Sequence, residues 1–250
     1  MSERAQLYQA ITLLVVILSF DVLERRIPGY AVHRRQDLAL NIVAILIVIV
    51  AGEFWKILVL DGLNAITSGR FITLAGVYIH KLPSIMRIFL GVALGDLSLY
   101  WVHRAMHRTK LWRTHTFHHS IEEIWWLAGS RTSLTHLLLF AVPQVFIAYC
   151  LLELSPWEAG VAFSVGVVVN IWIHTNLKAN LGLLGRILIT PDFHRIHHGV
   201  KGFSGKNFGF VFTVWDRLFG SYVDPQSLGE DIAVGFVSTR KRLFRMVVGF

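Results

Sequence analysis

Residues 95–120 read GDLSLYWVHRAMHRTKLWRTHTFHHS, and residues 190–199 read TPDFHRIHHG. The first stretch begins as an apolar run and ends in histidines, and the second repeats the spacing of its last part. His103 and His107 are four residues apart, so a helix places both imidazoles on one face. Two clusters follow the pattern HxxHH: His115, His118 and His119, then His194, His197 and His198. Because adjacent histidines can reach two neighbouring ions, this spacing favours a two-metal site.

The histidines are concentrated in one part of the chain, since ten of the twelve lie between residues 103 and 198. A single histidine is more often a core or surface residue than a metal ligand. Three clusters with ligand spacing in one chain make that interpretation the less favoured one. The candidate metal ligands are His103, His107, His115, His118, His119, His136, His174, His194, His197 and His198.

The composition is typical of a membrane protein. Of 250 residues, 54% are hydrophobic and 16% charged, and the mean hydropathy is +0.55. A soluble domain usually has about a quarter of its residues charged. The candidate spans, each near the ~20 apolar residues that cross a bilayer, are residues 6–23, 38–60, 85–103, 134–153 and 157–175. We expect an all-α integral membrane protein with about four to five membrane-embedded helices and a cytoplasmic, histidine-rich helical cap that holds a di-metal site.

The basic residues indicate how the spans are oriented. If the first span runs inward, most of the 24 lysines and arginines face the cytoplasm, in accord with the positive-inside rule. The ten clustered histidines then lie on the cytoplasmic side, and His80 lies on the far side. Residues 7–20 lack a strong basic leader and a small-residue cleavage site, so we expect a retained anchor. We expect a multi-pass protein of a bacterial inner membrane rather than of the endoplasmic reticulum.

The net charge of +8 has two interpretations. Basic residues beside apolar spans contact anionic lipid headgroups, whereas a nucleic-acid-binding protein carries a recognition motif as well. Because the chain shows no such motif, membrane lipids are an expected partner and nucleic acid is not. Cys150 is the single cysteine and lies in an apolar span, which excludes a disulfide framework.

The chain is expected to form a single membrane domain over residues 1–250. An anchor hairpin and connector occupy 1–84, a catalytic region occupies 85–223, and a basic tail occupies 224–250. The spans at 134–153 and 157–175 should form an antiparallel hairpin that returns His136 and His174 to one side. Pro191 and Gly199 are placed to begin and end a short helix. The basic, apolar end of the chain either lies on the membrane surface or packs as a helix.

Asp96 is the one carboxylate that we expect at the site. It lies seven residues before His103, so both side chains share a helix face. In one interpretation it accepts the second N–H of a metal-bound imidazole and thereby orients that ligand. In the other it makes a polar contact inside the membrane.

These stretches resemble the sterol desaturase/fatty acid hydroxylase superfamily of membrane-bound, histidine-rich di-iron enzymes. The resemblance covers roughly residues 90–223, and its histidine spacing is highly specific. The stretches that carry it are residues 95–107, 111–120, 190–199, 207–209 and 215–220. One departure concerns the motif Arg-x-His-Pro, which many members have after the second cluster. Here Ser133 takes the usual histidine place, and His136, one helical turn on, is the expected substitute ligand.

The resemblance implies a reaction and its partners. O2 is activated at two iron ions with two external electrons, and a lipid C–H bond is hydroxylated or desaturated. The chain has no motif for binding a flavin, a haem or a nucleotide, so the electrons come from a separate protein, a b-type cytochrome or a ferredoxin-like carrier with its reductase. Sterol, fatty acyl, sphingoid and ether lipids all fit as substrates.

Two points stay open at the level of sequence. Imidazole also suits zinc, so the alternative is a non-redox zinc-binding membrane protein, namely an inactive relative, a scaffold or a transporter. A transporter usually has ionisable residues through the depth of the bilayer, whereas here they gather at one side. The apolar residues near the clusters line a substrate tunnel or, as the more favoured interpretation, form core or an interfacial belt: Trp125, Trp126, Leu127, Leu139 and Phe140.

Overall fold

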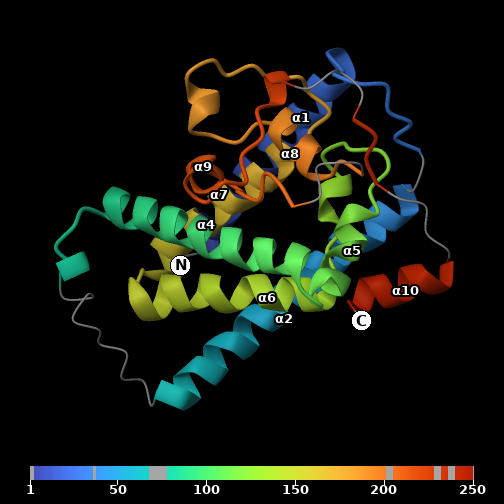
Figure 1. Ribbon diagram of the computed structural model, residues 1–250. Helices are drawn as coiled ribbons and strands as arrows, with labels where there is room; N and C mark the ends of the chain where they lie inside the picture. The colour runs from blue at the N-terminus through green and yellow to red at the C-terminus, as the bar shows by residue number, and fades with distance from the viewer. Residues whose placement is uncertain are drawn as a thin grey trace.

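The computed structural model describes residues 3–35, 38–67, 78–200, 205–227, 232–235 and 240–249 (Figure 1). Within these ranges the chain is built from helices, and its β-structure is limited to two isolated bridges. The predicted all-α class is therefore confirmed. The long helices are α1 (Glu3–Arg26), α2 (Leu38–Thr67), α4 (Ser84–Arg108), α6 (Leu134–Val145) with its π-helical continuation η2 (Phe146–Leu151), and α7 (Pro156–Ile173).

Four helical segments in the described part of the chain are long and apolar enough to cross a membrane. They are Leu38–Leu63, Ser84–Arg108, Leu134–Leu151 and Pro156–Ile173. Each coincides with a span predicted from the sequence, which confirms a multi-pass arrangement of about four helices. The first predicted span, at 6–23, lies within α1, where apolar side chains such as Leu14 and Leu18 are exposed.

Helix α4 lies at the centre of the bundle. It packs against both α6 and α7, while α2 packs along α6 and α1 along α7. Figure 1 shows α4 and α6 side by side, with α5 (Trp112–His119) and α10 (Arg240–Val248) at one end of the pair. The N-terminal helices therefore have extensive contacts with the predicted catalytic region. The division of the chain at 84 stays a prediction.

The end of the bundle away from α5 is defined by the turn between η2 and α7. Ser155 caps α7 by accepting the backbone N–H of Glu158, whose carboxylate accepts the N–H of Ser155 in return. His80 lies at this end, with its Nε2 2.9 Å from a carboxylate oxygen of Glu153. Because His136 is at the opposite end of α6–η2, His80 is far from the clustered histidines, as expected.

The remaining short helices form the cap. They are α5, η1 (Ala128–Ser130), η3 (Leu184–Arg186), α8 (Pro191–His197), α9 (Val214–Leu218), η4 (Pro225–Ser227) and α10. The predicted helix between Pro191 and Gly199 is confirmed as α8, in which the Thr190 side chain accepts the N–H of Phe193. Helix α10 packs against α5 and buries Met246 beside Phe117, which favours the packed-helix interpretation of the chain end.

Candidate metal centre

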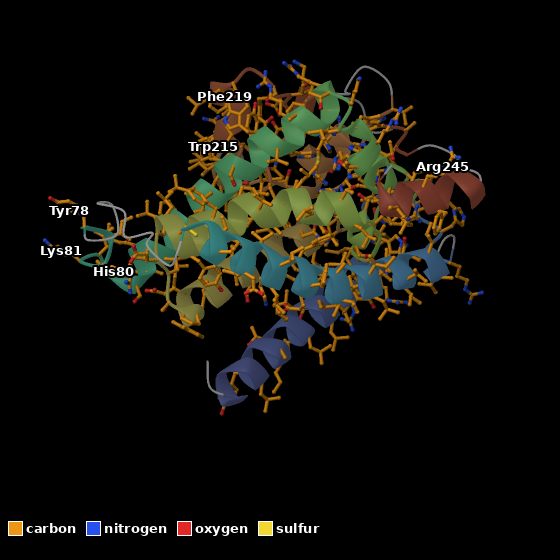
Figure 2. The ribbon with its side chains drawn as sticks, turned by 90° about the horizontal axis from the view of Figure 1, so that it is seen from below. Tyr78, His80, Lys81, Trp215, Phe219 and Arg245 are labelled. Atoms are coloured by element: carbon orange, nitrogen blue, oxygen red, sulfur yellow. The ribbon has the colours of Figure 1, made fainter. Side chains whose placement is uncertain are left out.

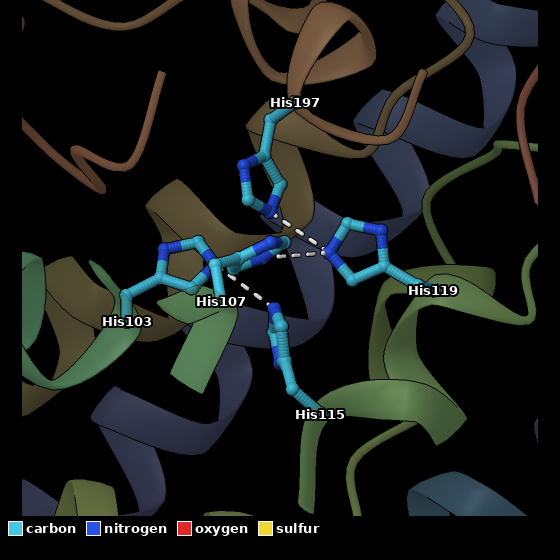
Figure 3. A group of neighbouring side chains, drawn as sticks. All are labelled: His103, His107, His115, His119 and His197. Carbon is cyan, nitrogen blue, oxygen red and sulfur yellow. Dashed lines mark hydrogen bonds between the residues drawn. The ribbon is translucent and has the colours of Figure 1, made fainter. Parts of the chain in front are cut away.

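Nine of the ten candidate histidines converge in two groups of ring nitrogens. The first group contains His103, His107, His115, His119 and His197, and the second contains His118, His174, His194 and His198. Within each group the potential ligand atoms all lie within 4.8 Å of one another. Figure 3 shows the imidazoles of the first group pointing toward a common centre. Segments up to 94 residues apart in the sequence therefore meet at one place.

Three helices build the first group. His103 and His107 lie one turn apart on α4, His115 and His119 lie one turn apart on α5, and His197 comes from α8. The Nε2 atom of His103 is 2.9 Å from that of His115. The Nε2 atom of His119 is 3.1 Å from that of His107 and 3.0 Å from that of His197. The group is thus a close cluster of Nε2 atoms.

The second group is built mainly from the ends of helices. His118 comes from the last turn of α5, His174 caps the end of α7, His194 lies in the middle of α8, and His198 caps its end. The Nε2 atom of His174 is 3.3 Å from that of His118 and 3.0 Å from that of His194. The Nε2 atoms of His194 and His198 are 3.1 Å apart.

These separations suit metal coordination. A metal–nitrogen bond of about 2.1 Å places two ligand nitrogens about 3.0 Å apart at a right angle and about 3.4 Å apart at the tetrahedral angle. The two groups also adjoin, because the ring centroids of His119 and His198 are only 4.7 Å apart. Each adjacent pair is divided between them: His118 and His198 belong to the second group, while His119 and His197 belong to the first.

Backbone carbonyls hold several of these rings by Nδ1. Since a carbonyl oxygen only accepts, Nδ1 carries the hydrogen, and the lone pair of Nε2 is free to bind a metal. His103 donates to Phe208 at 2.8 Å and His197 to Lys206 at 3.0 Å, both in the loop before α9. In the second group, His118 donates to Arg131 at 3.1 Å and His174 to Asn170 at 2.7 Å.

The histidines outside the spans are held in the neutral form. Burial lowers the pKa of His118, His119 and His194 well below the ordinary value, and the neighbouring imidazoles lower it further. Burial likewise lowers the pKa of His174 to about 4. Neutral imidazole is the form that coordinates a metal, so no proton has to leave at neutral pH. The two groups are therefore suited to hold metal ions.

Asp96 does not contact an imidazole, in contrast to one sequence-based interpretation. One carboxylate oxygen accepts the backbone N–H groups of Phe210 and Val211, and the other accepts the N–H of Phe212 and the indole N–H of Trp215. Seven residues on a helix rise about 10 Å, which carries the carboxylate away from His103. Asp96 thus holds the loop beside α4, and the structure connects it to the first group only through that loop.

Asp216 supports the first group, although no role was predicted for it from the sequence. Its carboxylate accepts the backbone N–H of Phe208 at 2.7 Å and of Gly209 at 2.6 Å, and also the hydroxyl of Ser221. Phe208 is the residue whose carbonyl accepts the Nδ1–H of His103. The signal was available, because a buried acid beside metal-binding motifs commonly positions a ligand.

Glu24 supports the second group from outside the region of resemblance. One of its oxygens accepts the backbone N–H of Asn176 at 2.6 Å and of Trp126 at 3.0 Å, and the other pairs with Arg34 at 2.8 Å. Asn176 is two residues after His174, so α1 is tied to the end of α7. The available signal was an acidic residue at the end of an apolar span, and no role was predicted for Glu24 from the sequence.

His136 lies outside both groups, although it is buried beside them. Its Nδ1 atom is 3.3 Å from the Nδ1 of His115, and its Nε2 atom is enclosed without a hydrogen-bond partner among the described residues. Ser133, which takes the usual histidine place, caps α6 instead: its hydroxyl accepts the N–H of His136 and donates to the carbonyl of Thr114. The expected substitution of His136 for that ligand is thus not visible in the geometry.

The apolar residues near the clusters divide between core and site. Trp125 and Leu127 are buried in a core cluster with Ile121, and the indole N–H of Trp126 donates to Asp21. Phe140 is different, because its ring centroid is 4.3 Å from that of His136. The core interpretation therefore describes the tryptophans, while Phe140 adjoins the histidines.

Comparison with known proteins agrees with this geometry. The fatty acid hydroxylase family matches residues 88–221, which contain all ten candidate histidines. The alkylglycerol monooxygenase of Danio rerio is 36% identical over 56% of this chain and 30% of its own length, and that of Homo sapiens is 34% identical over 54% and 29%. The ornithine lipid hydroxylase OlsE of Rhizobium tropici is 29% identical over 57% of this chain and 44% of its own length.

The chain thus spans less than half the length of these relatives. No solved structure matches it. The family match includes both histidine groups and covers more than half of the 250 residues. On this basis the chain belongs to the fatty acid hydroxylase family, as the resemblance of its histidine motifs indicated.

Proposed function

We propose that this chain is a membrane-bound di-iron oxidoreductase that uses O2 and two external electrons to hydroxylate or desaturate a lipid C–H bond. The observation that carries the proposal is the pair of adjoining groups of buried, neutral imidazoles in a chain of this family with four apolar spans. Imidazole nitrogen suits iron, and a two-ion site suits O2 chemistry. Membership of a metal-dependent lipid hydroxylase family supports a role in lipid oxidation.

In this proposal the first group holds one ion with five imidazoles, and the second group holds the other with four. Both sets leave coordination positions open if each ion is six-coordinate. When bound, the two irons supply the redox chemistry: one oxygen atom of O2 enters the C–H bond, and the other is reduced to water with two electrons and two protons. The apolar surroundings of the imidazoles exclude bulk water from this chemistry.

We assign His136 a positioning role beside the first group. If the Nε2 of His115 binds a metal, its Nδ1 carries a hydrogen, which the Nδ1 of His136 accepts at 3.3 Å. His136 then stands where backbone carbonyls stand for His103 and His197. Its own Nε2–H is left buried, and an oxygen atom of a bound water or substrate would satisfy it.

The substrate is proposed to be a membrane lipid that enters from the bilayer beside the spans. Relatives named for alkylglycerol and ornithine lipid favour lipids of these two classes as the first to test. The electrons are proposed to come from a separate b-type cytochrome or ferredoxin-like carrier with its reductase. The histidine groups are proposed to face the cytoplasm, and a bacterial inner membrane remains the proposed location.

The test combines metal analysis with a lipid assay. Detergent-purified protein is produced with iron supplied, and its metals are measured by mass spectrometry and Mössbauer spectroscopy. Two irons per chain that respond to reduction and O2, together with conversion of an alkylglycerol or an ornithine lipid seen by mass spectrometry, would support the proposal. Two zinc ions that resist exchange for iron, or fewer than two metals, would favour the non-redox alternative.

A further inference from the structure

One part of the cap exposes apolar side chains in an unusual number. It is formed by η3 with its flanks and by α9, and we call it the η3–α9 surface: Leu183, Leu184, Ile187, Val214 and Leu218. Leu183 is 75% exposed, Leu184 60% and Leu218 65%. Clustered exposed leucines on a polar cap indicate contact with an apolar partner.

Hydrogen bonds from Thr213 join the two segments of this surface. The N–H of Thr213 donates to the carbonyl of Ile187 at 2.8 Å, and the Thr213 hydroxyl donates to the carbonyl of Arg186 at 2.6 Å. Leu188 and Phe212 form an antiparallel bridge. The exposed side chains before and after these contacts therefore belong to one structural unit.

This unit lies along α4 rather than only above its histidine end. Asp96 binds the backbone of residues 210–212, and the ring of Phe212 is 6.3 Å from that of Phe89, near the start of α4. Phe219 packs at 4.7 Å against Trp101, which is itself exposed on α4. In Figure 2, Trp215 and Phe219 lie beside α4, between His80 at one end of the molecule and Arg245 at the other.

The position along α4 sets the depth of this unit in a membrane. Asp96 is twelve residues before Arg108, which corresponds to about 18 Å along the helix. The apolar span of α4 runs over Ser84–Arg108, and a hydrocarbon core is about 30 Å thick. If α4 crosses the bilayer, the loop that Asp96 holds is therefore at the level of the lipid chains.

The hydrogen bonding of the loop is compatible with that depth. Irregular backbone survives at membrane depth only where its polar groups are satisfied within the protein. Asp96 accepts three consecutive backbone N–H groups, and the N–H of Ile189 donates to the carbonyl of Val211 at 3.1 Å. This also gives a physical reason for a buried carboxylate in the middle of an apolar helix.

Two exposed arginines flank the surface, Arg186 on η3 and Arg217 on α9. Long basic side chains beside apolar surface commonly extend to reach lipid phosphates. The Arg217 guanidinium lies 3.7 Å from the ring centroid of Tyr222, so part of its length is packed on the protein. Apolar side chains with a basic rim match the chemistry of a phospholipid layer.

We propose that the η3–α9 surface is a second membrane contact, inserted among lipid acyl chains beside α4, with the basic side chains of Arg186 and Arg217 at its edge. The cap is then partly embedded and does not only cover the ends of the spans. This proposal rests on the exposed surface and its place along α4. It is independent of the metals and of the lipid oxidation proposed above.

Site-directed spin labelling tests the proposal directly. The single cysteine is replaced by Cys150→Ser, and a nitroxide is attached after Leu184→Cys or Leu218→Cys. Leu46→Cys, at an exposed position on the α2 span, is the lipid reference, and Lys110→Cys, in the exposed turn between α4 and α5, is the water reference. Each protein is reconstituted in phosphatidylcholine/phosphatidylglycerol vesicles, and nitroxide collisions with O2 and with a water-soluble nickel chelate are measured.

We expect nitroxides at both test positions to collide more often with O2 than with the nickel chelate, because O2 concentrates in acyl chains. The ratio of the two collision rates should be within about twofold of the ratio at the Leu46 reference. A preference for nickel at either position, as at Lys110, would overturn the proposal. The four sites are exposed, so labelling should leave the fold intact. An unchanged gel-filtration profile and metal content relative to Cys150→Ser would establish this for each variant.

Discussion

The two histidine groups are made from the same motifs but are supported differently. The first group has four of its five imidazoles on α4 and α5, whereas the second combines α5 and α8 with His174 at the end of α7. Each HxxHH motif serves both groups, because adjacent histidines point to different clusters. A motif in the sequence is therefore not equivalent to a site in the structure.

The supports of the two groups also come from different parts of the chain. Asp96 and Asp216 hold the loop that orients His103 and His197, and both carboxylates lie within the family match of residues 88–221. Glu24 holds the segment after His174 and lies outside that match. The second group thus receives support from the N-terminal helix, although its ligands belong to the region shared with the family.

The largest expected effect separates the two groups by one residue. His119→Ala should remove the metal of the first group and His118→Ala that of the second, so each variant retains about one metal ion per chain. The measurement is metal content by mass spectrometry after loading with iron. His80→Ala is the control at the far end of the bundle and should retain two ions. If His118→Ala and His119→Ala lose the same ion, the division into two groups is wrong.

Replacing His136 tests whether the first group has a sixth histidine ligand or a positioning residue. His136→Ala should weaken metal binding at the first group by roughly 10–100-fold, the usual cost of losing a ligand's hydrogen-bond partner. His136→Asn should restore most of the affinity, because its amide oxygen replaces Nδ1 as acceptor toward His115. Titration with cobalt, followed by its visible spectrum, measures both. A whole metal equivalent missing from the Asn variant at saturation would identify His136 as a ligand.

A matched pair of carboxylate substitutions compares the two supports. Asp96→Asn should lower the metal affinity of the first group by about tenfold and leave that of the second group unchanged. The substitution replaces one acceptor oxygen with an amide NH2 group that faces backbone N–H donors. Glu24→Gln should lower the metal affinity of the second group and leave that of the first group unchanged. Cobalt titrations of both variants, with the groups distinguished by the His118→Ala and His119→Ala spectra, measure these effects. If either variant lowered the metal affinity of both groups equally, the two groups would not have separate supports.

The last prediction concerns a property that both groups share. Their imidazoles are neutral in the folded protein, so its stability should depend on pH. The unfolded chain binds protons near the ordinary histidine pKa of about 6.5. In the folded protein, burial lowers the pKa of His174 to about 4 and holds that of His118 and His194 well below the ordinary value. The contribution of these histidines to the free energy of unfolding is therefore fully present above pH 6.5 and is lost as the pH is lowered below it.

Accordingly, the Tm of metal-free protein should fall by about 10 °C between pH 7.5 and 5.5, since each of these histidines loses about 1.4 kcal/mol of stabilisation per pH unit below 6.5. The Tm of the metal-loaded protein should change less over the same pH range, because the bound metal occupies the same nitrogen lone pairs and stabilises the folded state. Thermal unfolding in detergent measures both curves. A metal-free Tm that rises on acidification would show that these histidines are charged in the folded protein.

Several features could be predicted because their causes are local. The apolar spans follow from hydropathy, and α8 follows from Thr190, Pro191 and Gly199 at its ends. The shared helix face of His103 and His107 follows from the helical repeat. Asp96 shows the limit of this reasoning: its helix face was read from the spacing, but its partners, 114 or more residues away, were not.

By itself, the sequence determined that this protein is helical, membrane-embedded and rich in imidazole ligands at helical spacing, since hydropathy and helix periodicity act within one or two turns. Only the tertiary structure decided that His118 and His119 serve different groups, that His136 contacts His115, and that Glu24 supports the end of α7. The physical reason is that coordination and buried hydrogen bonds join atoms from helices far apart in the chain. Their partners are therefore set by how α1, α4, α5, α7 and α8 pack, which no local pattern specifies.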